Sequence, residues 1–191
     1  NVNQLAKSVQ DIIRDQQDEA GKYELSAMDE LKKAIENAQF YVDGEHIDIK
    51  GGDAKSKIDQ ALEYLVSHVY SELSLITKNA DSDEDIIFIL TGKEQVISGT
   101  EPNRDAASKM EEYLEMQARK NLPTSMADIQ SRYSGIPYGW KEIDIAAVAA
   151  RLIFDQKVTI KYAGTTIQPD NPKLPDMLRK KSEIGKTSIS K

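Results

Sequence analysis

The run from Asp144 to Gln156 constrains the fold of this chain more than any other part of it. Positions 145–154 hold nine apolar residues and one charged residue, Arg151, so the predicted helix is apolar nearly all round. A helix of this kind must be covered on several sides by other elements. It is too short to cross a bilayer, which takes about 20 apolar residues, and no other stretch of the chain approaches that length. We therefore expect a core helix and no membrane span.

The residues around this helix predict a compact motif. Residues 157–162 alternate between polar and apolar side chains, as a half-buried strand does, and a turn leads to a return strand within 163–167. A shorter helix, with a start signal at Ser125 and Asp128, precedes the apolar helix. Helix, turn, helix and hairpin is the order of a winged-helix core. We predict a winged-helix-like domain over residues 122–191, with a basic tail that includes a short helix around 175–181.

The first 121 residues predict a helical domain that contains one β-hairpin. A helix over 2–20 is expected to break at Gly21, and a second helix is expected to begin at Ser26. A hairpin is predicted near 40–49, because an Asp-Gly pair that tolerates positive φ lies between two short strand-like runs.

The longest apolar stripe lies on a helix predicted over residues 53–77, about seven turns long, which we expect to be the spine of the first core. Further helices are predicted from Ser82 and over 104–120, with a loop over 92–103. The fold class expected for the whole chain is α+β, mainly α, with a domain boundary at 121–122.

Charge is distributed unevenly along the chain. The formal net charge is −7, yet residues 157–191 carry eight basic and three acidic side chains. The acidic remainder would repel nucleic acid at long range, so only this last part could attract DNA. The candidate contacts to a DNA backbone are Lys157, Lys161, Arg179, Lys180 and Lys181. The alternative is that these residues form a solvated surface and tail.

The helix predicted over 144–156 occupies the position of the DNA-recognition helix of a winged-helix domain, and its composition disfavours sequence-specific reading of DNA. A recognition helix presents polar and basic side chains to the major groove. This one is mostly Ala, Ile, Val and Leu, it starts with Glu142 and Asp144, and its one well-placed base is Arg151. Any DNA contact would therefore be non-sequence-specific and sensitive to salt. Docking of a protein is the other use that an apolar helix in this slot suits.

Two segments resemble nucleotide-binding motifs without meeting their requirements. Gly185-Lys186-Thr187 matches the end of a P-loop, but Lys180 stands where the first glycine should be, and no apolar strand precedes it. The acids at 83–85 precede an apolar run, whereas Walker B acids follow one. We therefore predict no phosphate-binding loop in this chain.

Other catalytic and metal-binding patterns are also missing from the sequence. Cysteine is absent, which excludes disulfides, thiol catalysis and cysteine-bound zinc. His46 and His68 have no partner at a metal-ligand spacing, and no Gly-x-Ser-x-Gly elbow occurs. A pair of catalytic carboxylates remains a third, unsupported hypothesis. We predict no catalytic, cofactor-binding or metal-binding residue and no enzyme activity in this chain.

The most unusual local feature is the turn Pro137-Tyr138-Gly139-Trp140, which contains the only tryptophan. A glycine between two large rings indicates a backbone conformation that other residues avoid. These four residues are our candidate interaction motif, with exposed aromatic rings that a partner could contact. The alternative is that Tyr138 and Trp140 fill the gap between two helices, as large aromatic side chains often do in a small core.

Three segments together resemble a known family. They are Tyr133-Ser134-Gly135-Ile136-Pro137-Tyr138-Gly139-Trp140 with the apolar helix to Phe154, the run Val158 to Gly164, and the hairpin Phe40 to Gly44 before a long helix. This combination is similar to the large P-loop ATPases of BREX-type phage-defence systems. The resemblance implies an internal fragment of a much larger, cytoplasmic bacterial protein that acts on or near DNA within a multi-protein defence complex.

Because the ATPase motifs are absent here, the resemblance assigns no catalytic residue. It implies a regulatory, assembly or DNA-proximal module. The first hypothesis is a non-catalytic interaction module whose partners are other protein domains of a larger chain or complex. The alternative is a DNA-contacting winged-helix domain that uses its basic wing and tail.

Overall fold

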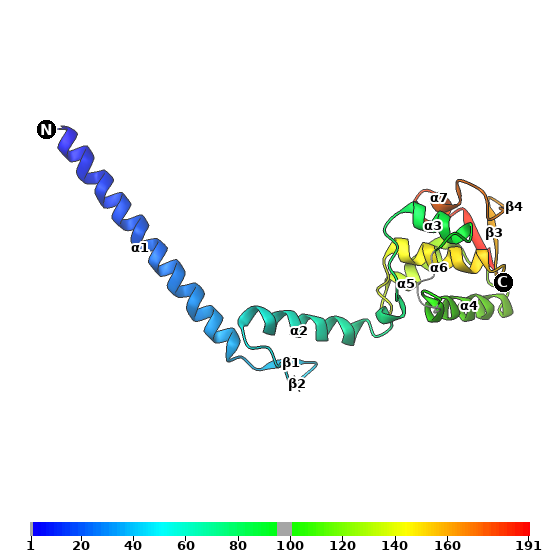
Figure 1. Cartoon of the computed structure of the whole chain (residues 1–191), viewed down its shortest axis with the longest axis horizontal. Helices are drawn as coiled ribbons and strands as arrows, with labels where there is room; N and C mark the ends of the chain where they lie inside the picture. Colours follow the sequence, from blue (N-terminus) through cyan, green and yellow to red (C-terminus); the bar gives the residue numbers. More distant parts are fainter. Residues whose placement is uncertain (1, 95–100) are drawn as a thin grey trace. The chain divides into compact units, whose positions relative to one another are not determined.

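The computed structural model describes residues 2–94 and 101–191, with side chains from residue 6 onward. These residues form helices and two antiparallel sheets, one with two strands and one with three (Figure 1). The mixture confirms the predicted fold class, α+β and mainly α. The chain divides into two compact units, which we call unit 1 (Asn1–Val66) and unit 2 (Ser67–Lys191).

Unit 1 begins with one long helix, α1 (Val2–Glu36). The predicted break at Gly21 and the new start at Ser26 are therefore wrong. A single glycine costs a helix about 1 kcal/mol relative to alanine, and the Glu, Gln and Lys residues around it favour the helix. Ion pairs one turn apart add to this, such as the 2.7 Å contact between Lys33 and Asp29.

A hairpin follows α1, as predicted. It pairs β1 (Phe40–Val42) with β2 (Glu45–Ile47), and Tyr41 lies opposite His46 with ring centroids 5.4 Å apart. The turn places both central residues at positive φ, 51° for Asp43 and 84° for Gly44, which is why an Asp-Gly pair forms it.

The long helix predicted over 53–77 is shorter in the structure. It is α2 (Ala54–Val69), and a 3-10 turn, η1 (Leu73–Leu75), follows it. The predicted role of this helix as the spine of a core is also wrong, because no residue of α2 is buried. Among the described side chains of unit 1, Ile47 alone is buried.

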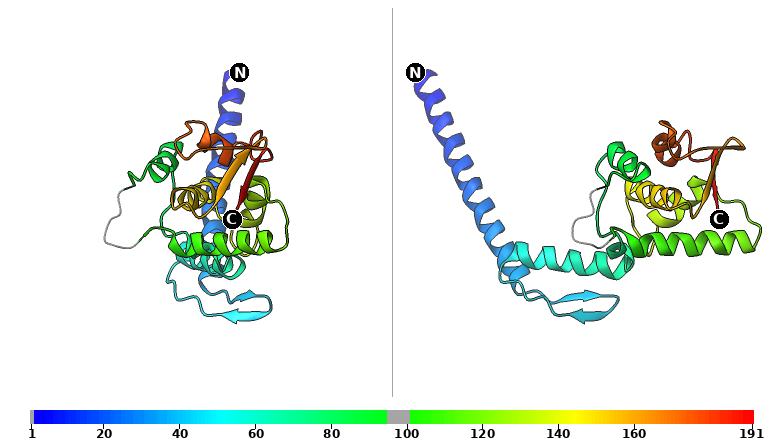
Figure 2. Two further views of the ribbon diagram at one scale, coloured as in Figure 1. Left: turned by 90° about the vertical axis from the view of Figure 1, so that its right-hand side faces the viewer. Right: turned by 45° about the vertical axis from the view of Figure 1, so that its right-hand side comes forward.

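Unit 2 holds the hydrophobic core. Its elements are α3 (Asp83–Leu90), α4 (Arg104–Arg119), α5 (Met126–Ser134), α6 (Glu142–Phe154), β3 (Thr159–Tyr162), β4 (Thr165–Thr166), α7 (Leu174–Arg179) and β5 (Thr187–Ser190). Figure 2 shows α6 lying between α3 and α4, and it also packs against α5 and α7. The order α5, turn, α6, β3–β4 hairpin confirms the predicted winged-helix arrangement, with α6 as its buried helix.

The sheet of unit 2 has the strand order β4-β3-β5, so the last residues of the chain form a third strand. Ile189 is paired with Ile160, and the Ile189 amide donates to the Thr124 carbonyl at 3.0 Å. Thr187 and Ile189 are buried. Residues 187–190 are therefore part of the folded unit and not of a solvated tail. Four residues of alternation are too few to be recognised as a strand from sequence.

The units divide between Val66 and Ser67, whereas the sequence predicts a boundary at 121–122. The difference arises because α3 and α4 share one core with α6. Ile86 of α3 and Met110 and Leu114 of α4 are fully buried in the same cluster as the apolar residues of α6. Local periodicity cannot show which helix covers which, so it could not place the boundary.

A buried carboxylate fixes the segment that leads into α3. Asp144, in the first turn of α6, is 1% exposed and accepts hydrogen bonds from the Ala80 amide at 2.7 Å and the Asn79 side chain at 2.9 Å. Asn103 holds the preceding residues in the same way, accepting from the Thr77 and Lys78 amides at 2.8 and 2.9 Å. These two side chains tie residues 77–80 to the starts of α6 and α4.

Replacing Asp144 by Ala should lower the free energy of unfolding of unit 2 by about 1.5–3 kcal/mol, because the Ala80 amide would lose its partner in a buried position. Asp155→Ala is the control, since Asp155 is exposed just after the same helix, and a change within about 0.5 kcal/mol is expected. Urea unfolding followed by Trp140 fluorescence measures both. Equal effects of the two variants would contradict the assigned role of Asp144.

Candidate functional site

The helix at the position of a DNA-recognition helix, α6, is covered by other elements. Nine of the thirteen residues of α6 are buried, and α3 packs along it. Arg151, the one basic residue of the helix, is paired with Glu94 and lies 3.6 Å from Glu101. A helix in this state cannot present a polar face to a DNA major groove without the loss of its cover. The geometry supports the expectation that α6 does not read base edges.

Three of the five candidate DNA-backbone residues are already engaged with carboxylates. Lys157 lies 3.1 Å from Glu111, Lys180 lies 2.8 Å from Asp176, and Arg179 pairs with Glu142 at 3.1 Å and also with Asp83.

Ion pairs of this kind also shift the pKa values of the carboxylates and cations that form them. The hydrogen bond from Lys191 is the main reason why the pKa of Glu111 is lowered, and the hydrogen bond from Lys180 to Asp176 raises the pKa of Lys180.

Lys161, on the wing strand β3, and Lys181 are exposed and make no ion pair with any residue of the described part of the chain. A phosphate could reach these two without displacing a carboxylate.

The candidate interaction motif is split between the core and the surface. Trp140 is 2% exposed, stacks on Tyr133 with ring centroids 4.7 Å apart, and donates from Nε1 to the Glu72 carbonyl at 3.0 Å. Gly139 has φ 64°, and a Cβ there would lie 2.6 Å from the Tyr70 ring, so both the conformation and the space require glycine. Trp140 therefore fills a gap in the core, and Gly139 leaves room for the Tyr70 ring.

Pro137 and Tyr138 are half-buried, and they meet residues that the sequence did not single out. They line a hollow of about 650 Å³ together with Tyr113 of α4, Arg132 of α5 and Ile136. The Arg132 guanidinium carbon lies 4.4 Å above the centre of the Tyr113 ring, within the range of a cation–π contact. Ile136 is 69% exposed.

Arg132 has no carboxylate partner among residues 6–94 and 101–191. Sequence reasoning missed this group because Tyr113 and Arg132 come together only when α4 packs beside α5. The one sequence signal available was the position of Arg132 five residues before the turn Pro137-Tyr138-Gly139-Trp140. We call Tyr113, Arg132, Ile136, Pro137 and Tyr138 the arginine–tyrosine surface.

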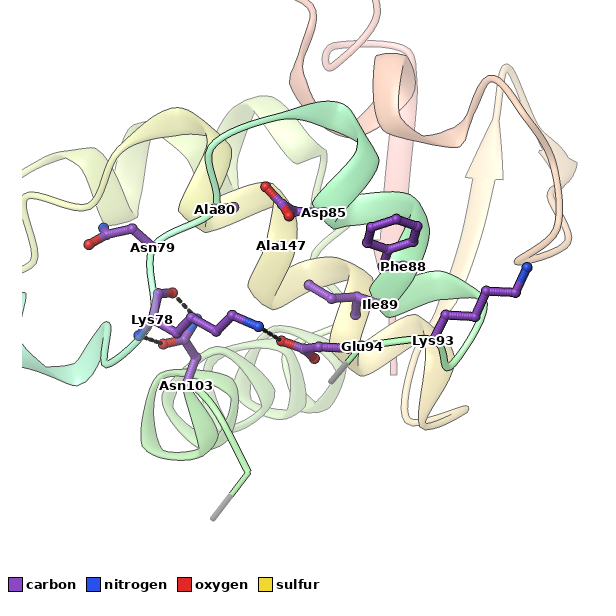
Figure 3. A pocket seen from close by; sticks show the side chains of 10 residues that line it. All are labelled: Lys78, Asn79, Ala80, Asp85, Phe88, Ile89, Lys93, Glu94, Asn103 and Ala147. Atoms are coloured by element: carbon purple, nitrogen blue, oxygen red, sulfur yellow. Dashed lines mark hydrogen bonds and ion pairs between the residues drawn. The ribbon is translucent and has the colours of Figure 1, made fainter. Parts of the chain in front are cut away.

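A second hollow, of about 310 Å³, lies against α3 and α6 (Figure 3). Its carboxylates have structural partners. Asp85 accepts from the amides of Asp81 and Ser82 at 2.9 and 3.0 Å, which lowers its pKa, with the Asp81 bond as the main cause. Glu94 lies 3.0 Å from the Lys78 ammonium. The described residues that line this hollow therefore include no pair of opposed, unpartnered acids for general acid–base chemistry.

The remaining chemical candidates have ordinary structural surroundings. In the Gly185-Lys186-Thr187 segment, Thr187 is buried at the start of β5 and its hydroxyl donates to the Glu183 carbonyl at 3.0 Å. The Thr187 hydroxyl is therefore engaged by the backbone. The residues that the structure describes contain no group of three or more His, Asp or Glu side chains arranged to hold a metal ion. Nor is any helix within them long and apolar enough to span a membrane.

Fold and site together define a winged-helix module in which neighbouring helices cover α6, the helix at the DNA-recognition position. Residues 72–191 match the family model described as the BREX ATP-binding protein BrxC winged helix-turn-helix domain. Residues 1–65 match the model for the BrxC fourth domain with a six-stranded β-sheet. The chain belongs to this family of BREX phage-defence proteins, which confirms the resemblance seen in the sequence. No solved structure matches the chain.

The two matched models are the winged-helix and fourth domains. They meet between residues 65 and 72, close to the division between the compact units.

Proposed function

We propose that this chain is a non-catalytic interaction and regulatory module of a longer BREX ATP-binding protein, and that unit 2 docks another protein domain through the arginine–tyrosine surface. The observation that carries the proposal is the burial of α6, which removes the usual DNA-reading face of a winged helix. The other faces of the unit stay available for protein contacts. The proposal includes the cytoplasmic location that the family resemblance implies.

The chemistry of the surface indicates what the partner presents. Arg132 contacts the Tyr113 ring and has no carboxylate partner among the described residues, so an acidic side chain on the partner would satisfy its donors. Ile136 and Pro137 beside it offer apolar area. Tyr and Arg are the residue types that most often carry the binding energy of protein interfaces. We therefore propose a partner segment with an acidic residue next to an apolar one.

The test uses the longer protein with Arg132→Ala. We expect phage restriction, measured as plaquing efficiency, to weaken at least about tenfold, which is the effect of losing about 1.4 kcal/mol of binding. The rate of ATP hydrolysis should stay within twofold of that of the unmodified longer protein, a difference of about 0.4 kcal/mol in activation free energy. Arg119→Ala is the matched control, because Arg119 is exposed on α4 and makes only a long 3.8 Å contact with Glu115. Full restriction by Arg132→Ala would contradict the proposed docking surface.

The second candidate function is non-specific contact with DNA, and the unpaired Lys161 and Lys181 are the observation that favours it. Fluorescence anisotropy of the chain with duplex DNA at about 50 and 200 mM salt separates the two functions. The docking proposal predicts no binding at the lower salt. Binding that weakens steeply with salt and falls on Lys161→Ala would support the DNA function in its place.

A further inference from the structure

The turn Pro137-Tyr138-Gly139-Trp140 is fastened by residues 70–72, which directly follow α2 in the chain. The Glu72 amide donates to the Pro137 carbonyl at 3.0 Å, and Trp140 Nε1 donates to the Glu72 carbonyl at 3.0 Å. One residue, Glu72, therefore binds both the first and the last residue of the turn. Any change in the separation of Pro137 and Trp140 would strain or break one of these two hydrogen bonds.

Tyr70 contacts the middle of the same turn. A Cβ at position 139 would come within 2.6 Å of the Tyr70 ring, so the ring lies directly against the Gly139 backbone. Gly139 has φ 64°, a conformation that L side chains rarely adopt. Close-packed groups transmit strain, because neither of them moves without displacing the other. The Tyr70 ring therefore helps to hold the turn in this backbone conformation.

The turn also contributes two residues to the arginine–tyrosine surface. Pro137 and Tyr138 line its hollow, and the Arg132 guanidinium carbon lies 5.8 Å from the centre of the Tyr138 ring. Both neighbours of Tyr138 in the turn are fixed by residues 70–72, one by a hydrogen bond and the other by the contact with a ring. The position of the Tyr138 ring beside Arg132 therefore depends on that segment.

We infer that Tyr70 is a positioning residue for the arginine–tyrosine surface, and that the turn couples this surface to residues 70–72. The inference rests on the proposed function, since it takes a partner to bind this surface. Coupling is reciprocal, so a partner that favours this conformation of the turn would also strengthen the contacts of residues 70–72. The two matched family models meet between residues 65 and 72, so binding of the partner would be felt at the junction between the matched domains.

Hydrogen exchange of the Glu72 amide in the 191-residue chain tests the coupling without a partner. Tyr138→Ala should accelerate this exchange at least about tenfold, because the turn would lose the ring that packs beside Arg132 and would open more often. Tyr113→Ala is the matched control, since Tyr113 belongs to the same surface but lies on α4, outside the turn. The control should leave the exchange of the Glu72 amide within about twofold.

Exchange of the α6 amides in the same samples shows that both variants are folded. Equal exchange of the Glu72 amide in Tyr138→Ala and Tyr113→Ala would overturn the inference.

The positioning role of Tyr70 is tested in the longer protein by phage restriction. Tyr70→Ala should weaken restriction at least about fivefold, the lower end of usual coupling between sites. Tyr70→Phe keeps the ring that lies against Gly139, so it should restrict as the unmodified protein does. Leu174→Ala is the control for stability, because Leu174 is fully buried in α7 and does not line the hollow. Restriction should be kept in this control.

The outcomes separate the inference from the docking proposal. Full restriction by Tyr70→Ala, together with weakened restriction by Arg132→Ala, would overturn the inference and leave the docking proposal in place. Equal losses in Tyr70→Ala and Leu174→Ala would assign the effect to stability and would also overturn the inference. Full restriction by Arg132→Ala would contradict the docking proposal and, with it, the positioning role of Tyr70. The exchange of the Glu72 amide needs no partner, so it decides for or against the coupling in each case.

Discussion

Trp140→Ala should destabilise unit 2 by about 3–5 kcal/mol, the usual cost of truncating a buried aromatic residue. Three contributions are lost together: the burial of the indole, its stacking on Tyr133, and the hydrogen bond to the Glu72 carbonyl. Since the variant has no tryptophan, urea unfolding is followed by circular dichroism.

Two further variants separate the contributions of Trp140. Trp140→Phe keeps an aromatic ring but not the Nε1 donor, so it should cost less than the alanine variant. Ile136→Ala removes an exposed side chain of the same turn and should change the free energy of unfolding by no more than about 0.5 kcal/mol. A similarly small change for Trp140→Ala would mean that the ring is not part of the core and would return it to the interaction motif.

The second large effect is expected at the end of the chain. Ile189→Ala should cost about 2–5 kcal/mol, as for other buried aliphatic residues, because Ile189 is 1% exposed in β5 and packs in the core of unit 2. Urea unfolding monitored by Trp140 fluorescence reports on this unit directly.

Ser190→Ala is the matched control for that experiment. Ser190 is the exposed neighbour on the same strand, opposite Thr159 of β3, so its replacement should be nearly neutral. If Ile189→Ala were also neutral, residues 187–190 would behave as the solvated tail that their polar composition suggests. The two variants thus distinguish a third strand from a tail.

Much of unit 2 was predictable because its local signals agree with its packing. The Ser125–Asp128 pair predicts the start of α5, and in the structure the Asp128 amide donates to the Ser125 hydroxyl at 3.2 Å while Asp128 accepts from the Ser125 amide. The nearly continuous apolar run predicts a buried helix, and α6 is one. A helix that is apolar nearly all round is stable in water only when other elements cover it.

Unit 1 was predicted less well, since its patterns do not distinguish a covered face from an uncovered one. The stripe of α2 predicts burial, but the surfaces that would bury it are not among the described residues. Gly21 predicts a break in α1, but its cost is small against the helix-forming residues on both sides, so the helix continues through it.

The candidate site shows the same division. The sequence singled out the turn at 137–140 from its unusual composition, but it could not say which ring is buried. In the structure, Tyr70 leaves room at position 139 only for glycine, and Tyr133 stacks on Trp140. The same packing leaves Tyr138 beside Arg132, a neighbour from another element that composition cannot reveal.

Capping, turn chemistry and apolar periodicity act over a few residues, so they are enough to predict the type of most elements, the Asp-Gly hairpin and the winged-helix order. Three features emerge only from packing: α3 lies against α6, the last residues form β5, and several cations are already paired with carboxylates. These features depend on contacts between residues far apart in the chain. Their energies come from burial and charge pairing, which no local pattern records.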